Sequence, residues 1–265
     1  MTDSKSVLIG TPVTRRTAFA FDNFMKNQKE IQDRCPQSRL VIATDEPDFE
    51  EELKEYLRGY SVEGDVIAYE TKKPDYARDR IWRIIAGREA IRKYALNTDA
   101  NYLLYFDADM TCDPAIIDIM KEKIRGYDVV LSGYSYRLKN VGGFILGSGC
   151  SLFRREILEK VEWRCYEFKN HLIISEELLF DRDLFRLRAK IKKGVFFKIN
   201  HYLNSHEMNT TEPQDLSLFR RIITLPFFRY ILVISSVILK HHMAPLMRLW
   251  YTLKKRSRVL ADIGN

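Results

Sequence analysis

The sequence predicts an α/β protein with a largely parallel sheet, followed by a basic and apolar helical tail. Strand-like apolar runs alternate with helix-like segments over roughly the first 210 residues. Hydrophobic residues make up 46% and charged residues 30% of the 265 residues, which excludes disordered and collagen-like chains. Strands separated by helices form parallel sheets, and such sheets bind ligands at the carboxyl ends of their strands.

The first unit is a short apolar strand, Val7–Ile9, followed by a helix from Thr14 to about Arg34. Proline cannot continue a helix, so Cys35-Pro36 ends it. The helix is predicted because one face carries residues at helical spacing: Phe21, Phe24, Met25, Gln28 and Ile31.

The same alternation continues along the chain. The further strands that we expect are Arg39–Thr44, Asp65–Tyr69, Tyr102–Phe106, Asp128–Leu131 and Val195–Ile199. The further helices that we expect are Pro47–Arg58, Asp79–Leu96, 114–125 and one that begins at Ser175.

The cysteines and the first residues favour a reducing compartment. Cys35, Cys112, Cys150 and Cys165 form no CxxC pair, which argues against a zinc ribbon or a disulfide-stapled fold. The residues before the first strand do not have the pattern of a secretory signal. We therefore expect a cytoplasmic protein.

Positive charge is concentrated at the end of the chain. Residues 216–265 have a net charge of +8, whereas residues 1–215 have a net charge of −1. The apolar run Ile222–Leu239 has 18 residues and contains Arg229 and Pro226, whereas spanning a bilayer takes about 20 apolar residues.

We therefore expect residues 213–265 to form a basic amphipathic helical tail. Residues 216–260 would make peripheral contact with the cytoplasmic face of a membrane, since they join basic and aromatic residues to an apolar run. A hydrophobic hairpin packed on the domain is the main alternative. A tail that binds nucleic acid is the third alternative, but an apolar run of this length is atypical of one, so we expect no nucleic-acid partner.

Asp107 and Asp109 follow the apolar strand Tyr102–Phe106 with one residue between them. Two carboxylates at a strand end can converge on a hard cation such as Mn²⁺ or Mg²⁺. Aspartate at this position is also common in turns and caps, a role that Asp113-Pro114 can fill nearby.

Arg88 is predicted to point inward, because it shares a helix face with apolar residues. A buried guanidinium needs an anionic partner, either a carboxylate such as Asp107 or Asp109 or a phosphate. Downstream, the glycine-rich segment 142–149 permits close approach of the backbone to a ligand, or a simple bend.

Two further groups of residues could carry chemistry. Ser175 is suited to cap a helix on which Glu177 faces inward and Glu176 is rotated away. The inward face is assigned from the alignment of Glu177 with Phe180, Leu184, Leu187 and Ile191. His201 and His206 follow the last expected strand.

In this order, the features resemble the GT-A glycosyltransferases, especially the family 2 enzymes that use nucleotide-sugar donors. The resemblance runs from Val7 to about Glu207. It rests on features that follow one another along the chain. The first are Thr11-Pro12 after the first strand, Arg88 on the helix before the strand Tyr102–Phe106, and the segment Tyr105–Met110 (Tyr-Phe-Asp-Ala-Asp-Met). The others are the segment Gly147–Glu156 (Gly-Ser-Gly-Cys-Ser-Leu-Phe-Arg-Arg-Glu), a Glu-Glu pair in place of the usual Glu-Asp, and a late histidine. It implies a Rossmann-like GT-A domain over residues 1–212, with a mostly parallel sheet flanked by helices.

The resemblance also implies a function and its residues. The enzyme would move a sugar, with inversion, from a UDP- or GDP-sugar to a hydroxyl of a glycan or lipid-linked acceptor. Glu177 would be the general base, with Glu176 as the alternative. The implied ligands of Mn²⁺ or Mg²⁺ are Asp107, Asp109 and His206, with His201 competing for the last place. The implied donor-binding residues are Thr11, Pro12, Asp45, Arg88, Asp107, Gly147, Ser148 and Gly149.

Two other functions compete with this one. The segment 107–111 fits the DxDxT motif of haloacid-dehalogenase-like phosphatases, in which the first aspartate is the nucleophile. That motif normally follows the first strand, whereas three strand–helix units precede it here, and no late acidic pair is evident. A non-catalytic GT-A-like binding module is the other alternative, and the predicted inward Glu177 argues against it.

Overall fold

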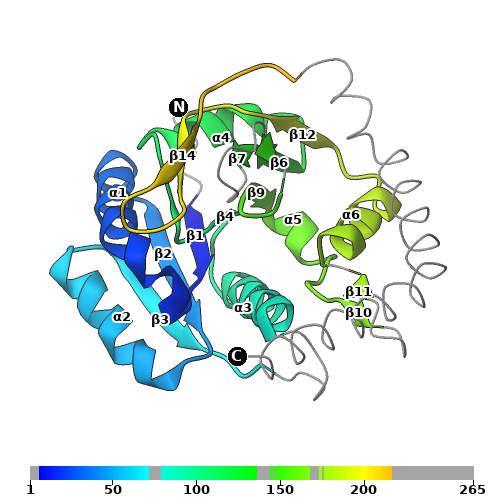
Figure 1. Ribbon diagram of the computed structural model, residues 1–265. Helices are drawn as coiled ribbons and strands as arrows, with labels where there is room; N and C mark the ends of the chain where they lie inside the picture. The colour runs from blue at the N-terminus through cyan, green and yellow to red at the C-terminus, as the bar shows by residue number, and fades with distance from the viewer. Residues whose placement is uncertain are drawn as a thin grey trace, which may run out of the picture.

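The computed structural model describes residues 6–71, 79–135, 144–145, 147–167, 173–174 and 176–216. The strands of its main sheet are β1 (Val7–Pro12), β2 (Ser38–Thr44), β3 (Gly64–Ala68), β4 (Tyr102–Phe106), β6 (Val129–Ser132), β9 (Cys150–Arg154) and β12 (Ile191–Gly194). They form a seven-stranded sheet in the order β12-β6-β9-β4-β1-β2-β3 (Figure 1).

Helices and short strands complete the fold. The helices are the 3₁₀ helix η1 (Arg15–Ala20) and α1 (Phe21–Arg34), α2 (Pro47–Gly59), α3 (Asp79–Leu96), α4 (Ile116–Lys123), α5 (Arg155–Leu158) and α6 (Glu176–Arg186). A small antiparallel sheet is made of β14 (Met208–Thr211), β13 (Ile199–Tyr202) and β5 (Met110–Cys112). The remaining strands pair two by two: β7 (Tyr134–Ser135) with β8 (Phe144–Ile145), and β10 (Tyr166–Glu167) with β11 (Ile173–Ile174).

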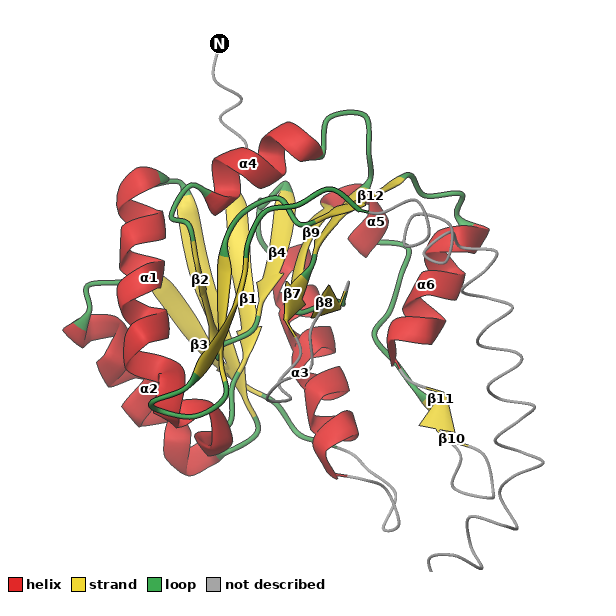
Figure 2. Ribbon diagram, turned by 45° about the horizontal axis from the view of Figure 1, so that its top comes forward, coloured by secondary structure: helices red, strands yellow, loops and turns green. Residues whose placement is uncertain are grey.

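The main sheet separates two layers of helices (Figure 2). Side chains alternate along a strand, so Val7 and Ile9 pack with α1, α2 and α4, whereas Leu8 packs with α3, α5 and α6. Both faces are therefore covered, and the apolar strands are buried between the layers as expected for an α/β fold.

The sheet is mostly parallel, as the sequence predicts, but β9 runs antiparallel to both of its neighbours, β4 and β6. The sequence does not reveal this direction. The chain enters β9 from the edge of the sheet where β4 ends. Residues 147–149, the described part of the glycine-rich segment directly before β9, therefore lie at the edge that holds the Asp107–Asp109 pair.

Two expectations need correction. The expected helix from Thr14 begins as η1 and becomes α-helical only at Phe21. The expected strand Val195–Ile199 is wrong, because β12 ends at Gly194 and β13 begins at Ile199. Val195 is buried because it lies where the chain passes from the main sheet to the small one, and it makes only an isolated bridge to Gln214.

The inward face predicted for α6 is also shorter than expected. Phe180 and Leu184 are buried, but Leu187 is 39% exposed and Ile191 belongs to β12. Arg188 has a φ of 53°, which stops the helix, and the backbone N–H groups of the chain just beyond the helix donate back to carbonyls of its last turn.

The tail lies almost wholly outside the described residues. Of its residues 213–216, which the structure describes, none is helical, which corrects the expected start of a helical tail at residue 213, and Leu216 is buried beside Val195. The predictions for residues 217–265 therefore stay predictions. Within the part of the chain that is described, no helix is long and apolar enough to cross a bilayer.

Candidate active site

The predicted site residues come together at one edge of the main sheet. The register pairs Gly10 with Tyr105 and Phe106 with Cys150, so the segments just past these pairs meet at the carboxyl end of β4. The predicted residues that meet there are Thr11, Pro12, Asp107, Gly147, Ser148 and Gly149.

Asp107 lies between a buried arginine and the glycine-rich segment. Its Oδ1 atom is 3.5 Å from Arg88 Nη2, and its backbone N–H donates to the carbonyl of Gly149 at 3.0 Å. A side chain at Gly149 would collide with the Asp107 carboxylate and would lie 2.6 Å from the Tyr134 hydroxyl oxygen. Gly149 therefore lets the backbone approach the Asp107 carboxylate, whereas the approach to a ligand that the glycine-rich pattern suggests stays a prediction.

Arg88 is 5% exposed, so the predicted inward direction is confirmed. Its guanidinium lies 5.3 Å from the centre of the Trp163 ring, and its backbone carbonyl accepts a hydrogen bond from the Tyr105 hydroxyl. Trp163 Nε1 donates to the same Tyr105 hydroxyl at 2.8 Å, and the Trp163 ring stacks on Phe180 of α6 at 4.1 Å. Burial raises the pKa of Tyr105, which keeps its hydroxyl protonated as a donor.

Asp109 faces a histidine from the small sheet. Met110 of β5 pairs with His201 of β13, and His201 Nε2 lies 3.3 Å from Asp109 Oδ2. The other ring nitrogen, Nδ1, is 2.7 Å from the carbonyl of Ser135, which can only accept a hydrogen bond. Nδ1 therefore carries the hydrogen and Nε2 is directed at the carboxylate, the arrangement in which histidine commonly ligates metals.

The structure separates the two candidate histidines. His201 is 4% exposed and contacts Asp109, whereas His206 lies exposed in the connection between β13 and β14. The backbone N–H of His206 donates to the side chain of Asn204, in a turn outside the carboxylate pair. The arrangement thus favours His201, the alternative of the sequence analysis, over His206.

Glu176 and Glu177 are the first residues of α6. Their side chains lie outside the described residues, so the choice between them stays a prediction. Phe180, one helical turn beyond Glu177, packs on Trp163, so the start of α6 is connected to Arg88 through buried aromatic rings.

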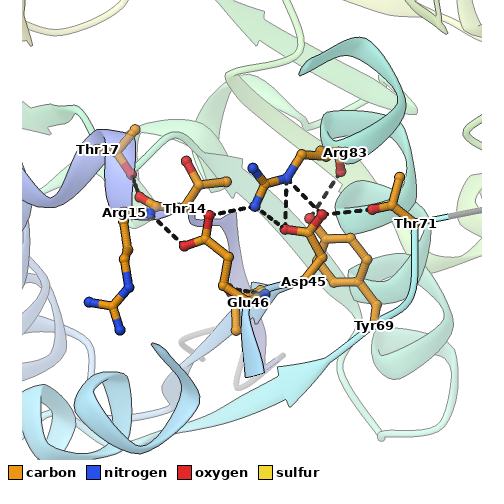
Figure 3. A network of polar contacts seen from close by, with 9 residues as sticks. Thr14, Arg15, Thr17, Asp45, Glu46, Tyr69, Thr71 and Arg83 are labelled. Carbon is orange, nitrogen blue, oxygen red and sulfur yellow. Dashed lines mark hydrogen bonds and ion pairs between the residues drawn. The ribbon is translucent and has the colours of Figure 1, made fainter. Parts of the chain in front are cut away.

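Asp45 lies in a network of polar contacts at the ends of β2 and β3 (Figure 3). Both of its carboxylate oxygens accept hydrogen bonds from Arg83 Nε, at 2.8 and 2.7 Å, and Thr71 donates to one of them. Arg83 also pairs with Glu46, which accepts the backbone N–H of Arg15. Asp45 thus fixes the start of α3 against β2, a role that the sequence analysis missed because Arg83 lies 38 residues away.

Thr11 offers a polar group to a ligand. Its side chain is fully buried, and its hydroxyl has no hydrogen-bond partner within the described ranges. A buried hydroxyl without a partner is unfavourable by about 1–3 kcal/mol. Cys150, close by, is unsuited to reaction, because burial and then the charge of Asp107 raise the pKa of its thiol well above the usual value.

The carboxylates at this edge suit a hard cation, although the described residues do not supply a complete set of metal ligands. Among them, no three His, Cys, Asp or Glu side chains are gathered as a metal site. Mg²⁺ is typically held by only one or two carboxylates together with phosphates of the substrate, so the pair at Asp107 and Asp109 fits this mode. Neighbouring Arg88 would face the same phosphates.

No protein-family model matches the chain, and a search of curated proteins gives no significant match. Among solved structures, the fold is similar to the mannosyltransferase PcManGT from Pyrobaculum calidifontis in complex with GDP-Man and Mn²⁺. The TM-score is 0.53 and the identity 11%, with 74% of this chain and 57% of that chain covered. The chain therefore spans little more than half the length of the mannosyltransferase.

Two other similar structures score lower. S. aureus TarS 1-349 in complex with UDP-GlcNAc has a TM-score of 0.48 at 12% identity, over 80% of this chain and 60% of that chain. Glucosyl-3-phosphoglycerate synthase from Mycobacterium tuberculosis has a TM-score of 0.47 at 13% identity, over 71% of this chain and 69% of that chain. At TM-scores below 0.5 these two carry no argument. At such low identity, the similarity to PcManGT shows the fold, which is the GT-A fold that the sequence predicts.

Proposed function

We propose that this protein is a metal-dependent glycosyltransferase, which moves a sugar from a UDP- or GDP-sugar to an acceptor hydroxyl. The observation that carries the proposal is the pair of carboxylates at the end of β4. Asp107 faces the buried guanidinium of Arg88, and Asp109 faces His201. An anionic diphosphate with a divalent cation would complete this set of charges.

The residues gathered at the carboxyl end of β4 have separate roles in this function. Asp109 and His201 would hold Mn²⁺ or Mg²⁺ directly, with His201 in place of His206, and Asp107 would hold a metal-bound water or the ribose of the donor. The cation, when bound, supplies positive charge to the leaving diphosphate. Arg88 adds a second positive charge there, which stabilises the negative charge that develops during transfer. Gly149 would let the backbone lie close to the sugar donor, and the Thr11 hydroxyl would form a hydrogen bond with it.

The acceptor hydroxyl needs a base on the side opposite the diphosphate. Glu177 is our candidate, with Glu176 as the alternative, because a carboxylate can take the proton as the hydroxyl attacks the sugar carbon. Attack in line with the leaving diphosphate gives inversion. The GT-A fold and the GDP-Man and Mn²⁺ bound by PcManGT support this proposal over the phosphatase alternative.

The test is nucleotide binding followed by turnover. Thermal shift and calorimetry with UDP, GDP and CDP, each with and without Mn²⁺, should identify one nucleotide that binds only with metal. Asp109→Asn should abolish that binding without lowering the melting temperature, because an amide cannot replace a carboxylate at a hard cation. Asp113→Asn is the matched control, since the Asp113 side chain accepts the backbone N–H of Ala115 in a nearby turn and forms no ion pair with any residue that the structure describes.

The outcomes separate the alternatives. Substantial Mn²⁺-dependent affinity in Asp109→Asn would show that the metal assignment is wrong. Metal-dependent binding without transfer to any acceptor or hydrolysis of the donor would favour the non-catalytic module. Phosphatase activity without nucleotide binding would favour the DxDxT alternative.

We also propose that residues 216–260 bring the enzyme to the cytoplasmic face of a membrane, which would suit a lipid-linked acceptor. The support is the sequence of residues 216–265, with a net charge of +8 around an apolar run too short to span. Co-sedimentation with anionic vesicles, compared between the protein and a Lys254→Gln/Lys255→Gln/Arg256→Gln variant, tests this. Equal binding of the two proteins would contradict it.

A further inference from the structure

The end of α6 and its connection to β12 expose apolar and basic side chains together. Residues 185–193 contain five basic residues and no acid. Phe185 is 52% exposed and Leu187 is 39% exposed, and within the described residues Met208 is the only other large hydrophobic residue with such exposure. We call residues 185–190 the α6 patch.

The charges of the α6 patch are not neutralised by the surrounding domain. Arg186, Arg188 and Lys190 are exposed and form no ion pair with any residue that the structure describes. Two acids lie beside the patch: Asp183 pairs with Arg164 at 2.6 Å, and Asp128 accepts the backbone N–H of Lys190 at 2.7 Å, which leaves one carboxylate against three basic side chains. The patch therefore presents net positive charge beside two exposed apolar side chains.

We propose that the α6 patch docks on the surface of an anionic lipid bilayer. Basic side chains gain favourable energy beside anionic headgroups, and Phe and Leu gain by entering the boundary between headgroups and acyl chains. A nucleic acid would satisfy the arginines but would leave Phe185 and Leu187 in water. The tail of this chain does not complement the patch, because residues 216–265 also carry positive charge.

The place of the α6 patch in the fold keeps this contact apart from the chemistry. β12 is parallel to β6, and β6 and β4 are both antiparallel to β9, so β12 and β4 run in the same direction. The patch precedes β12, whereas Asp107 follows β4, so the two lie at opposite edges of the sheet. α6 and β12 also lie at the far end of the sheet from α2 and β3 (Figure 2). Docking of the patch would thus leave accessible the edge of the sheet that carries Asp107, where we propose that the nucleotide binds.

The test measures how the full-length protein partitions onto phosphatidylcholine vesicles with and without phosphatidylserine. Arg186→Gln/Arg188→Gln should weaken binding to the anionic vesicles by roughly 30-fold, since each basic residue contributes about 1 kcal/mol and 1.4 kcal/mol is tenfold. Lys26→Gln/Arg58→Gln removes the same charge from α1 and α2, at the other end of the molecule, and should weaken binding by less than about threefold.

A second variant pair isolates the apolar part. Phe185→Ser/Leu187→Ser should weaken vesicle binding by roughly tenfold or more, because the apolar contact is lost. All variants should keep the melting temperature and nucleotide affinity of the parent protein. Equal losses in the two charge variants would overturn the proposal, and so would failure of the parent to bind anionic vesicles. Loss of binding in the arginine variant but not in the apolar variant would point to an acidic protein or nucleic acid instead.

Discussion

Replacing Gly149 by alanine tests the proposed donor site at its closest backbone contact. The added methyl group would lie 2.9 Å from Asp107 Cγ, closer still to Oδ2, and 2.6 Å from the Tyr134 hydroxyl oxygen. Ordinary contacts of such a carbon begin at 3.4 Å, so a neighbour must move by at least half an ångström. The backbone cannot easily retreat, because the Gly149 carbonyl accepts the N–H of Asp107 at 3.0 Å.

The carboxylate yields most easily, since it is the end of a side chain that is 29% exposed, but the Tyr134 hydroxyl must move as well and Tyr134 is only 5% exposed. We therefore expect Gly149→Ala to destabilise the fold by about 1–3 kcal/mol, the usual cost of overpacking. Displacement of a ligand by about 1 Å can lower activity by about 100-fold, and we expect a loss of this size in transfer together with weaker Mn²⁺-dependent nucleotide binding.

Calorimetry with the preferred nucleotide and Mn²⁺, together with urea unfolding, separates the two effects. Gly59→Ala is the matched control, because nothing lies within 4 Å of the added carbon and the residue ends α2. It should raise the free energy of unfolding by about 0.4–1 kcal/mol and leave binding unchanged. If Gly149→Ala binds the metal–nucleotide pair as tightly as the parent, Asp107 does not take part in holding it.

Three further predictions concern single residues. His201→Ala should weaken metal-dependent nucleotide binding by at least about tenfold in calorimetry, whereas His206→Ala should leave it unchanged, and the reverse result would return the ligand role to His206. Glu177→Gln should lower transfer by at least about 100-fold with donor affinity intact, measured by steady-state kinetics, and a larger loss in Glu176→Gln would make Glu176 the base. Arg155→Ala should lower the free energy of unfolding in urea by about 2–3 kcal/mol, because its guanidinium donates to four backbone carbonyls, two at the end of α3 and two in the connection to β4. A loss below about 0.5 kcal/mol would mean that water replaces these hydrogen bonds.

The order of the elements could be predicted because their periodicities are strong. The ranges Asp79–Leu96 and Tyr102–Phe106 are observed as predicted, since the helix is long and the strand is apolar throughout. The strand predicted at Val195–Ile199 was wrong because an apolar run indicates that a segment is buried, not that its backbone pairs with another strand. The strand that pairs with β6 is instead β12, which contains Lys192 and Lys193 and occupies the edge of the sheet, where polar side chains are tolerated.

The candidate site was predictable only in its local parts. Asp107 and Asp109 follow a recognisable strand, and the inward direction of Arg88 follows from helical spacing. The choice between His201 and His206 depends on the pairing of β13 with β5, which joins residues about 90 positions apart. Sequence pattern gives no register for such a distant pair, so both histidines remained candidates until the sheet was known.

Trp163 illustrates what lies beyond any local pattern. Its sequence neighbourhood shows no periodicity, yet its ring lies against both the Arg88 guanidinium and the Phe180 ring. Its indole N–H and the Arg88 carbonyl share the hydroxyl of Tyr105, only two residues before Asp107. The segment that carries the carboxylate pair and the helix that carries Glu177 are therefore fixed to one buried aromatic cluster. Because buried rings pack closely and move little, this cluster sets the distance between the proposed metal site and the proposed base, which in-line transfer requires to stay constant.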